Sequence, residues 1–434
     1  MLEFGAAAST ALDHTDAVDE VVPPLLERLG GTPDLVVCFF SMEHAPAASG
    51  IALSLSERLG TSNIVGCTAQ AVIGGRRELE GVPGLSVWVA RLPGVEVRPF
   101  ALQVVQVSDG YGVTGWPNFD PDVRSTVVLL ADGFSFPTDR FLERLNEEQP
   151  GLPVIGGMAS GGEEPGQNRL LLRTDALQAG AVGVALDGPV EVRTVVSQGC
   201  RPIGSPYAVT RGDGNVVEEL GGQPAVERLR QLVSKLTPKE QVLARGGLHV
   251  GQVIDEHKAE FGRGDFLIRG LVGADPDTGA IAVGDAVELG QTLQFHVRDA
   301  DAADEDLRVL LDPVPDWNPR GVLLFSCNGR GRRFFGQPDH DAGQVARATG
   351  DVPLAGFFAQ GELGPVGKRN FVHGYTASLA VFCEPSDPSM AVFEAAEAAR
   401  IPVAPPASQP PVELPEEPPE PDGTPEPDGT PEPV

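Results

Sequence analysis

Hydrophobic and polar positions along the chain form one pattern that occurs three times. In each copy a short apolar run is followed by a segment with small or apolar residues at helical spacing, and then by a second apolar run that contains Gly-x-x-Ala and ends in a polar residue. Each middle segment ends near a glycine, where helices commonly stop. The first runs are 36–40, 127–130 and 322–325, the middle segments are 45–60, 137–151 and 340–350, and the second runs are 64–70, 154–160 and 354–360. The pattern therefore predicts a strand–helix–strand unit that is used three times.

The pattern also predicts elements outside these units. A further strand follows each Gly-x-x-Ala run, at 85–92, 181–187 and 377–383. Between the second and third copies, 214–236 predicts a short strand, a turn and an amphipathic helix, and 264–300 predicts a β-meander with glycine and aspartate turns. We therefore expect a mixed α+β fold in which repeated α/β units pack on mixed sheets, with an added β-meander.

The charge balance limits the classes of partner. Acidic residues outnumber basic ones by 61 to 32, so the formal net charge is −29. Nucleic acid is disfavoured as a partner, because phosphate binding needs a basic face. No apolar run reaches the ~18 residues that a membrane helix requires, and Met1–Thr10 lack the basic residues that begin a signal peptide. Five scattered cysteines are typical of reduced thiols, so we expect a cytoplasmic protein without membrane insertion.

The composition changes from residue 402 onward. This segment is rich in proline and glutamate, repeats PEPDGT in tandem and contains no basic residue. It has too little apolar surface to repay the entropy cost of ordering. We expect a disordered acidic tail over 402–434, preceded by a short helix over 386–401.

Two sets of motifs carry a family resemblance. In the first half of the chain they are NIVGCTAQAVIGG and PVIGGMASGG. In the second half, GCRPIGSPYAVTRGDGNVVEELGGQPAVERL, LLFSCNGRGRRFFG and DVPLAGFFAQGELGPV follow one another at family-like spacing. Together they resemble the FIST family, whose N- and C-terminal modules occur in bacterial signalling proteins and in an F-box protein of animals. The resemblance runs from about Asp34 to Glu384.

The resemblance implies an intracellular sensor of small ligands, for which amino acids are the usual suggestion. No kinase, receiver, methyl-accepting or F-box segment accompanies the motifs, so the chain resembles a stand-alone FIST protein. We expect an N-terminal lead with a helix over 1–33, a FIST N-like domain over 34–213 and a FIST C-like domain over 214–385.

A loop with two glycines and three arginines follows the apolar run 322–325. Open α/β sheets bind ligands at the carboxyl ends of their strands. Glycines let backbone N–H groups approach a ligand, and arginines donate paired hydrogen bonds to a carboxylate or phosphate. The alternative is that the arginines only neutralise neighbouring acids. The candidate ligand-binding residues of this loop are Ser326, Cys327, Asn328, Arg330 and Arg332.

The Gly-x-x-Ala runs are expected to supply facing walls of the same site. The third run and the residues after it offer a close backbone, an aromatic surface, an amide and a carboxylate, and a glutamate that faces an arginine loop suits a zwitterion. The alternative is that the small residues allow tight strand packing and that the phenylalanine belongs to the core. The candidates are Gly356, Phe357, Gln360 and Glu362, with Gly66, Cys67 and Gln70 as their counterparts in the first half.

Catalysis and metal binding have weaker support in the sequence. Cys327 precedes His340 and Asp341, which allows nucleophilic chemistry if the three side chains meet. A free cysteine at a strand end is more commonly an inert buried residue. The seven histidines are dispersed without ligand spacing, so no metal and no cofactor is expected.

We therefore expect a non-enzymatic sensor in signal transduction that binds a small anionic or zwitterionic metabolite, with an amino acid among the candidates. One alternative is a protein-interaction scaffold that uses the acidic tail as a docking arm for a protein partner. Another is an enzyme that depends on Cys327.

Overall fold

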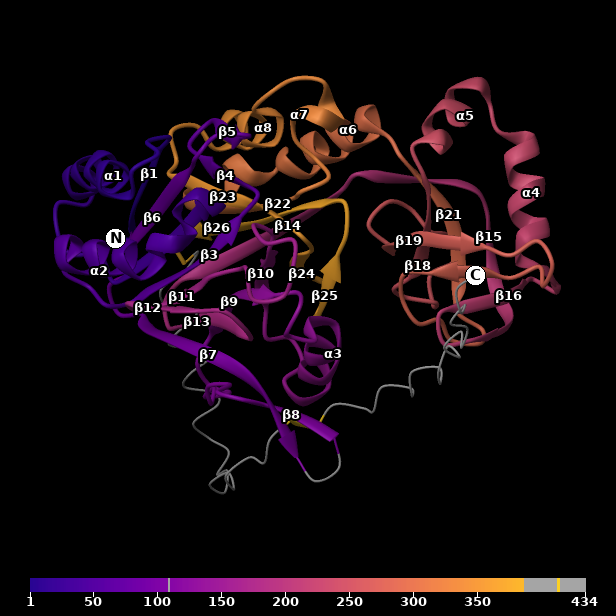
Figure 1. The fold of residues 1–434 in the computed structure, drawn as a ribbon, viewed down its shortest axis with the longest axis horizontal. Helices are drawn as coiled ribbons and strands as arrows, with labels where there is room; N and C mark the ends of the chain where they lie inside the picture. Colours follow the sequence, from indigo (N-terminus) through magenta and orange to yellow (C-terminus); the bar gives the residue numbers. More distant parts are fainter. Residues whose placement is uncertain (108–109, 386–411, 414–434) are drawn as a thin grey trace, which may run out of the picture.

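The structure is a computed structural model that describes residues 1–107, 110–385 and 412–413. It confirms the predicted mixed α+β fold and the three repeated units. Figure 1 shows these units gathered on one side of the molecule and a smaller β-rich lobe on the other. The short helix expected at 386–401 and the disordered tail expected at 402–434 lie outside the described residues, apart from the two-residue strand β27 (Val412–Glu413).

Each repeated unit has the same strand order. Its first strand pairs in parallel with the second strand through a crossover helix, and a returning strand pairs antiparallel with the other side of the first. These strands are buried almost throughout, which explains why continuous apolar runs mark them in the sequence. The first strands are β2 (Leu35–Ser41), β9 (Ser125–Asp132) and β22 (Pro319–Cys327); the crossover helices are α2 (Ala48–Leu59), α3 (Thr138–Glu148) and α8 (His340–Thr349); the second strands are β3 (Ile64–Ala69), β10 (Val154–Ala159) and β23 (Leu354–Ala359); and the returning strands are β6 (Leu85–Arg91), β13 (Ala181–Asp187) and β26 (Thr376–Cys383).

An additional strand lies beside each returning strand and precedes the unit in the chain. These strands are β1 (Glu3–Ser9), β7 (Glu96–Val107) and β14 (Glu191–Gln198). A helix separates the additional strand from the first strand in two of the units, namely α1 (His14–Leu29) in the first and α6 (Ala300–Leu311) in the third. In the second unit β8 (Gly110–Thr114) pairs with β7 instead, and β27 pairs with β8. The 3₁₀ helices are η1 (Met42–Ala47) and η2 (Val314–Trp317).

The hairpin that follows each second strand leaves its own unit and completes the sheet of another unit. The exchange is cyclic, so each unit gives one hairpin and receives one. Hairpin β4–β5 (Ala71–Gly74 and Arg77–Glu80) of the first unit pairs with β23 of the third, β11–β12 (Leu170–Leu172 and Asp175–Leu177) of the second pairs with β3 of the first, and β24–β25 (Glu362–Val366 and Arg369–His373) of the third pairs with β10 of the second. The three units therefore form one interlocked body.

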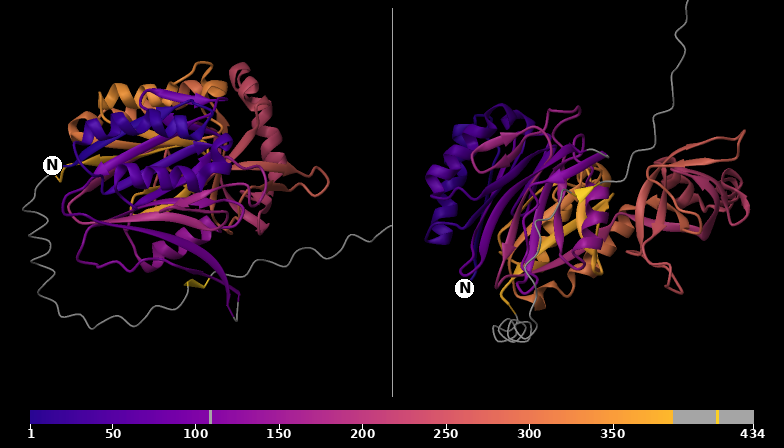
Figure 2. Two further views of the ribbon diagram at one scale, coloured as in Figure 1. Left: turned by 60° about the vertical axis from the view of Figure 1, so that its left-hand side comes forward. Right: turned by 90° about the horizontal axis from the view of Figure 1, so that it is seen from below.

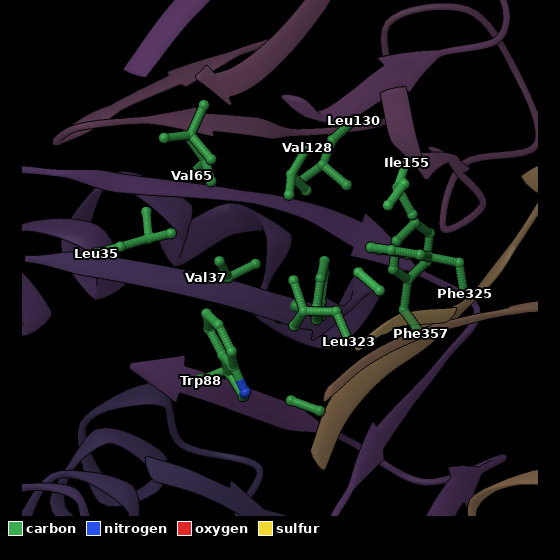
Figure 3. Close-up of a cluster of buried hydrophobic side chains, with 14 of the residues drawn as sticks. Leu35, Val37, Val65, Trp88, Val128, Leu130, Ile155, Leu323, Phe325 and Phe357 are labelled. Atoms are coloured by element: carbon green, nitrogen blue, oxygen red, sulfur yellow. The ribbon is translucent and has the colours of Figure 1, made fainter. Parts of the chain in front are cut away.

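The three sheets of this body share a central core. Val37, Val128 and Leu323 come from the three first strands and belong to one buried cluster (Figure 3). Because successive side chains of a strand point to opposite faces, Val36 and Cys38 belong instead to an outer cluster with α1 and α2. The crossover helices thus cover the outer faces of the sheets.

The glycine of each Gly-x-x-Ala run is required by the approach of two parallel strands. A Cβ atom on Gly66 would lie 2.0 Å from the carbonyl oxygen of the first-strand residue with which it pairs. At Gly156 and Gly356 the corresponding distance would be 1.8 Å. Any side chain at these positions would therefore push the strands apart, and tight packing is sufficient to explain the motif glycines.

A small barrel is inserted in the third unit between β14 and α6. Its strand order is β15–β21–β18–β19–β20–β16, and the pairing of β15 with β16 closes it. Figure 2 shows the barrel standing apart from the three units, and it has a hydrophobic core of its own. The predicted meander at 264–300 forms part of it. Its elements are β15 (Cys200–Asp213), β16 (Val216–Leu220), β17 (Gln223–Pro224), α4 (Ala225–Lys235), α5 (Pro238–Arg245), β18 (Leu248–Val253), β19 (Phe266–Ala274), β20 (Ile281–Val283) and β21 (Thr292–Arg298).

The expected division of the chain into 34–213 and 214–385 stays a prediction about sequence modules. In the structure the position between residues 213 and 214 falls in the turn that joins β15 to β16, two strands that pair with each other. Within the described ranges, no helix combines the length and the apolar character needed to cross a membrane.

Candidate functional site

The Gly- and Arg-rich loop follows β22 and is held in place by its own backbone and by the first unit. Asn328 N–H donates to the carbonyl oxygen of Ala359 at 2.8 Å, and Arg330 N–H donates to that of Cys327 at 2.8 Å. Gly331 has a φ of +72°, and a Cβ atom there would lie 2.7 Å from Oε2 of Glu80. Only glycine fits this position without strain, so Gly331 allows the chain to make a tight turn directly after the strand.

The hairpin β4–β5 from the first unit lies against this loop. Glu80 accepts a hydrogen bond from the backbone N–H of Arg332 at 2.9 Å. Glu78 accepts one from the N–H of Ala342 at 3.0 Å, and burial together with Asp341 raises the pKa of Glu78 to about 7. The exchanged hairpin thus shapes the loop and adds two carboxyl groups on one side of it.

Arg330 is buried and forms an ion pair with Asp341. Its Nε and Nη2 lie 2.6 and 2.9 Å from the two carboxylate oxygens, and the Ser326 hydroxyl donates to Asp341 at 2.7 Å. Burial alone would raise the pKa of Asp341, but Arg330 outweighs it and holds that pKa below its usual range. The alternative stated above, that the arginines only neutralise neighbouring acids, therefore accounts for two of the three guanidinium nitrogens of Arg330. The third, Nη1, has no hydrogen-bond partner among the described residues.

Glu362 is the second buried ionisable group at this place. It begins β24, and its Oε2 accepts hydrogen bonds from the N–H and hydroxyl of Thr376 at 3.1 and 2.7 Å. Burial raises the pKa of Glu362 to about 8, although Thr376 and the positive charge of Arg330 act in the opposite direction. Its other oxygen, Oε1, is buried and unpaired within the part of the chain that the structure describes. Glu362 thus lies close enough to Arg330 for the two charges to influence each other, and a role for this pair in binding stays a prediction.

The barrel supplies the opposite side of this region. The Arg298 guanidinium donates to the carbonyl oxygen of Gly329 and lies over the rings of Phe334 and Tyr375, at 4.6 and 5.1 Å from their centroids. The ring of His249 makes an edge contact with Tyr375 at 4.4 Å. Nε of Arg298 and Nδ1 of His249 also lack a partner within the described ranges.

Tyr375 connects the two sides through a constrained backbone. Its φ is +64°, a conformation that residues other than glycine rarely adopt. Its carbonyl oxygen accepts a hydrogen bond from Gly199 N–H at 2.8 Å. Burial raises the pKa of its phenol, with further contributions from Cys200 and Cys327. We call the group around it the junction site: Cys327, Arg330, Glu362 and Tyr375 from the third unit, and His249 and Arg298 from the barrel.

The structure places the other predicted residues outside the junction site. Asn328, Arg332 and Gln360 are exposed beside it. Gly356 and Phe357 are buried within β23, and Phe357 belongs to the central core. In the first unit, Gly66 and Cys67 are buried in β3, and Gln70 is exposed with its N–H donating to Ser160 at 3.0 Å. A role for these residues in binding stays a prediction.

The arrangement of Cys327 does not suit a nucleophile. Burial and the neighbouring Glu362 raise the pKa of its thiol to about 12, so the thiol stays protonated at neutral pH. The imidazole of His340 is occupied on both sides, by Asp341 at 2.9 Å and by Asp304 at 2.9 Å. No group of three or more metal-ligating side chains gathers anywhere in the described ranges.

Three members of the junction site were missed by reasoning from the sequence: His249, Arg298 and Tyr375. The first two lie in the inserted barrel, whose position against the third unit no sequence pattern indicates. Tyr375 stands in the segment His-Gly-Tyr-Thr, where the glycine marks a turn but not the residue that adopts positive φ.

Comparison of the sequence with known proteins places the chain in a family. The FIST N domain matches residues 34–223, and the FIST C domain matches residues 225–365. The chain is 47% identical over 390 residues to the uncharacterized protein Rv0628c of Mycobacterium tuberculosis, which covers 88% of this chain and 100% of that protein. It is 44% identical over 387 residues to the uncharacterized protein Mb0898c of Mycobacterium bovis, with 88% and 99% covered. FIST domains are generally sensory domains of signal transduction rather than catalytic ones. The chain belongs to the FIST family.

Proposed function

We propose that this protein is a sensor that binds a small zwitterionic metabolite, such as an amino acid, at the junction site. The observation that carries the proposal is the pair of opposite, buried and unpaired groups, Nη1 of Arg330 and Oε1 of Glu362. Buried polar groups nearly always have partners, and a charged group without one is costly. A ligand with a carboxylate and an ammonium group would supply both.

The chemistry of the two groups suits the two ends of such a ligand. Nη1 of Arg330 is a donor, and the Nε and Nη2 bonds to Asp341 fix its direction. A carboxylate there gains a charge-assisted hydrogen bond. Glu362 ionises when a cation approaches it, because a neighbouring positive charge lowers the pKa of a carboxyl group. The ligand's ammonium group would therefore bind Glu362 and displace its proton.

The surrounding side chains are aromatic rings, a guanidinium group and a thiol. Tyr375 and Phe334 present ring faces, with Arg298 already stacked on both. Cys327 adds a small, weakly polar surface. Before binding, the charge of Arg330 is balanced by that of Asp341, and Glu362 is protonated and neutral. A ligand without net charge therefore changes the charge of the site only through the proton that Glu362 releases.

A thermal-shift screen of the full chain tests the proposal. A ligand that binds only the native state raises its stability by RT ln(1 + [L]/Kd). We expect amino acids to raise the melting temperature, and expect matched compounds that lack either the amine or the carboxylate to have little effect. If no amino acid shifts the transition at millimolar concentration, the zwitterion assignment is wrong.

Calorimetry on variants then locates the site. Glu362→Gln removes the counter-ion for the ammonium group and should weaken binding about tenfold or more, because a hydrogen bond to a charged group contributes about 1.5–3 kcal/mol. Arg332→Ala serves as the control, since its side chain is exposed beside the junction site. Unchanged affinity in Glu362→Gln together with a loss in Arg332→Ala would move the site to the outer face of the loop.

A further inference from the structure

The barrel is attached to the interlocked body through two adjacent points of the chain. The chain enters the barrel at Gly199, after β14, and leaves it at Asp299, before α6. These two residues are joined by a hydrogen bond from Asp299 N–H to the carbonyl oxygen of Gly199 at 3.3 Å. Two neighbouring connections of this kind form a hinge, because rotation about them requires changes in only a few backbone angles.

The contacts across the junction are mainly polar. Arg269 of the barrel donates to the carbonyl oxygen of Val372 at 3.0 Å and lies 3.3 Å from Asp139. Arg263 donates to the carbonyl oxygen of Ala302 at 3.1 Å. Apolar contact includes a small cluster in which Tyr375 packs against barrel residues, Phe266 among them. Interfaces between domains that are not large and hydrophobic permit relative motion.

The junction site is divided between the two sides of this hinge. Arg330 and Glu362 belong to the body, whereas Arg298 belongs to the barrel and covers Tyr375 and Phe334. Arg330 is only 2% exposed and Glu362 is 0% exposed. A ligand therefore cannot reach these two groups in the arrangement that the structure shows, and some part of the cover must move before binding.

We propose that the barrel is a movable lobe that opens at Gly199–Asp299 to admit the ligand and is held against the body when the ligand is bound. This inference rests on the proposed function, since the ligand is the one that the junction site would take. Arg298 acts as the latch, because it is the barrel side chain that bonds the Gly-rich loop and stacks on two rings of the body. A competing arrangement, in which only side chains rotate and the barrel stays fixed, is an outcome of the test below.

The first arm of the test needs no ligand. Spin labels are placed on the full chain at Val242→Cys in α5 of the barrel and Leu53→Cys in α2 of the body, residues that are 64% and 49% exposed. The five native cysteines are buried, so labelling is selective. We expect a single narrow distance distribution that is lost when Arg298→Gln is added. Arg308→Gln, an exposed arginine on α6, is the matched control. An unchanged distribution in Arg298→Gln would overturn the movable lobe.

The second arm adds an equimolar mixture of the twenty standard amino acids at millimolar concentration. We expect the mixture to raise the melting temperature of the labelled protein and to restore a narrower distribution in Arg298→Gln. A thermal shift without any change in distance would overturn the hinge while the proposed function stands. Loss of the narrow distribution in Arg298→Gln without any thermal shift would support the movable lobe and contradict the proposed function. The two failures are thus distinguishable.

Discussion

Replacement of Glu362 by glutamine should stabilise the protein increasingly as the pH rises. The pKa of this carboxyl is raised from 4.5 to about 8 by burial. Between these two values the unfolded chain has released the proton while the folded protein still holds it, so the free energy of unfolding falls with rising pH. Each pH unit corresponds to about 1.4 kcal/mol, which sets the cost of keeping Glu362 buried near pH 8 at about 3 to 5 kcal/mol.

Glutamine removes this cost without removing the local structure. Its amide oxygen can still accept the two hydrogen bonds from Thr376, and its shape matches that of the protonated carboxyl group. The groups that act on Glu362, Arg330 and Cys327 among them, keep their positions. The stability gained by Glu362→Gln should therefore be near zero just above the usual pKa and should reach a few kcal/mol by about pH 8.

Urea unfolding across this pH range provides the assay. The difference in unfolding free energy between wild type and variant is plotted against pH, with Glu57→Gln on the exposed side of α2 as the control. The control should stay within about 0.5 kcal/mol of wild type at every pH. A difference for Glu362→Gln that does not grow with pH would show that the buried carboxyl is ionised in the folded protein, and the argument from burial would fail.

Three further predictions concern the framework around the site. Arg330→Met should cost about 3–5 kcal/mol because Asp341 would keep a buried charge without its partner, whereas Arg332→Met should be nearly neutral; chemical denaturation compares the two, and equal effects would contradict the buried ion pair. Gly356→Ala should cost about 3 kcal/mol because its Cβ would meet the opposing carbonyl, whereas Gly270→Ala, which has open space around it, should be tolerated; similar melting temperatures for both would refute the packing argument. A fragment that ends at residue 223 should not fold, because β4 and β10 lose their partners β23 and β24; a cooperative thermal transition of that fragment by circular dichroism would refute the interlock.

The repeated units were predictable because their signal is local. Continuous apolar runs such as 36–40 indicate fully buried strands, and their spacing leaves room for one crossover helix. The same locality places Glu362 and the arginine loop at one edge of the sheet, since both follow adjacent strands of one parallel pair. The strand ends of a parallel pair lie at the same edge whatever else the chain does.

The remaining features depend on contacts between distant segments. The short apolar runs of β4, β11 and β24 are equally suited to their own sheet or to a neighbouring one, so no pattern in the sequence reveals the exchange. The barrel side of the junction site was missed for the same reason, because Arg298 and His249 become relevant only through the packing of an inserted domain. Arg330 and Arg332 look alike in the sequence, and only the position of Asp341 on α8 separates the buried arginine from the exposed one.

The exchange of hairpins also determines when the protein can fold during its synthesis. β4 lies near the start of the chain, but its partner β23 is made near the end, with Gly74 pairing with Ala355. The edge of β4 therefore stays unpaired while the second unit and the barrel are being translated, and unpaired strand edges are prone to association with other chains. Long-range pairing of this kind also slows folding. We expect the sheet that contains β4 to be completed only after β23 has been translated. A pause or a truncation before residue 354 would therefore leave the whole body, and not just its last part, incompletely folded.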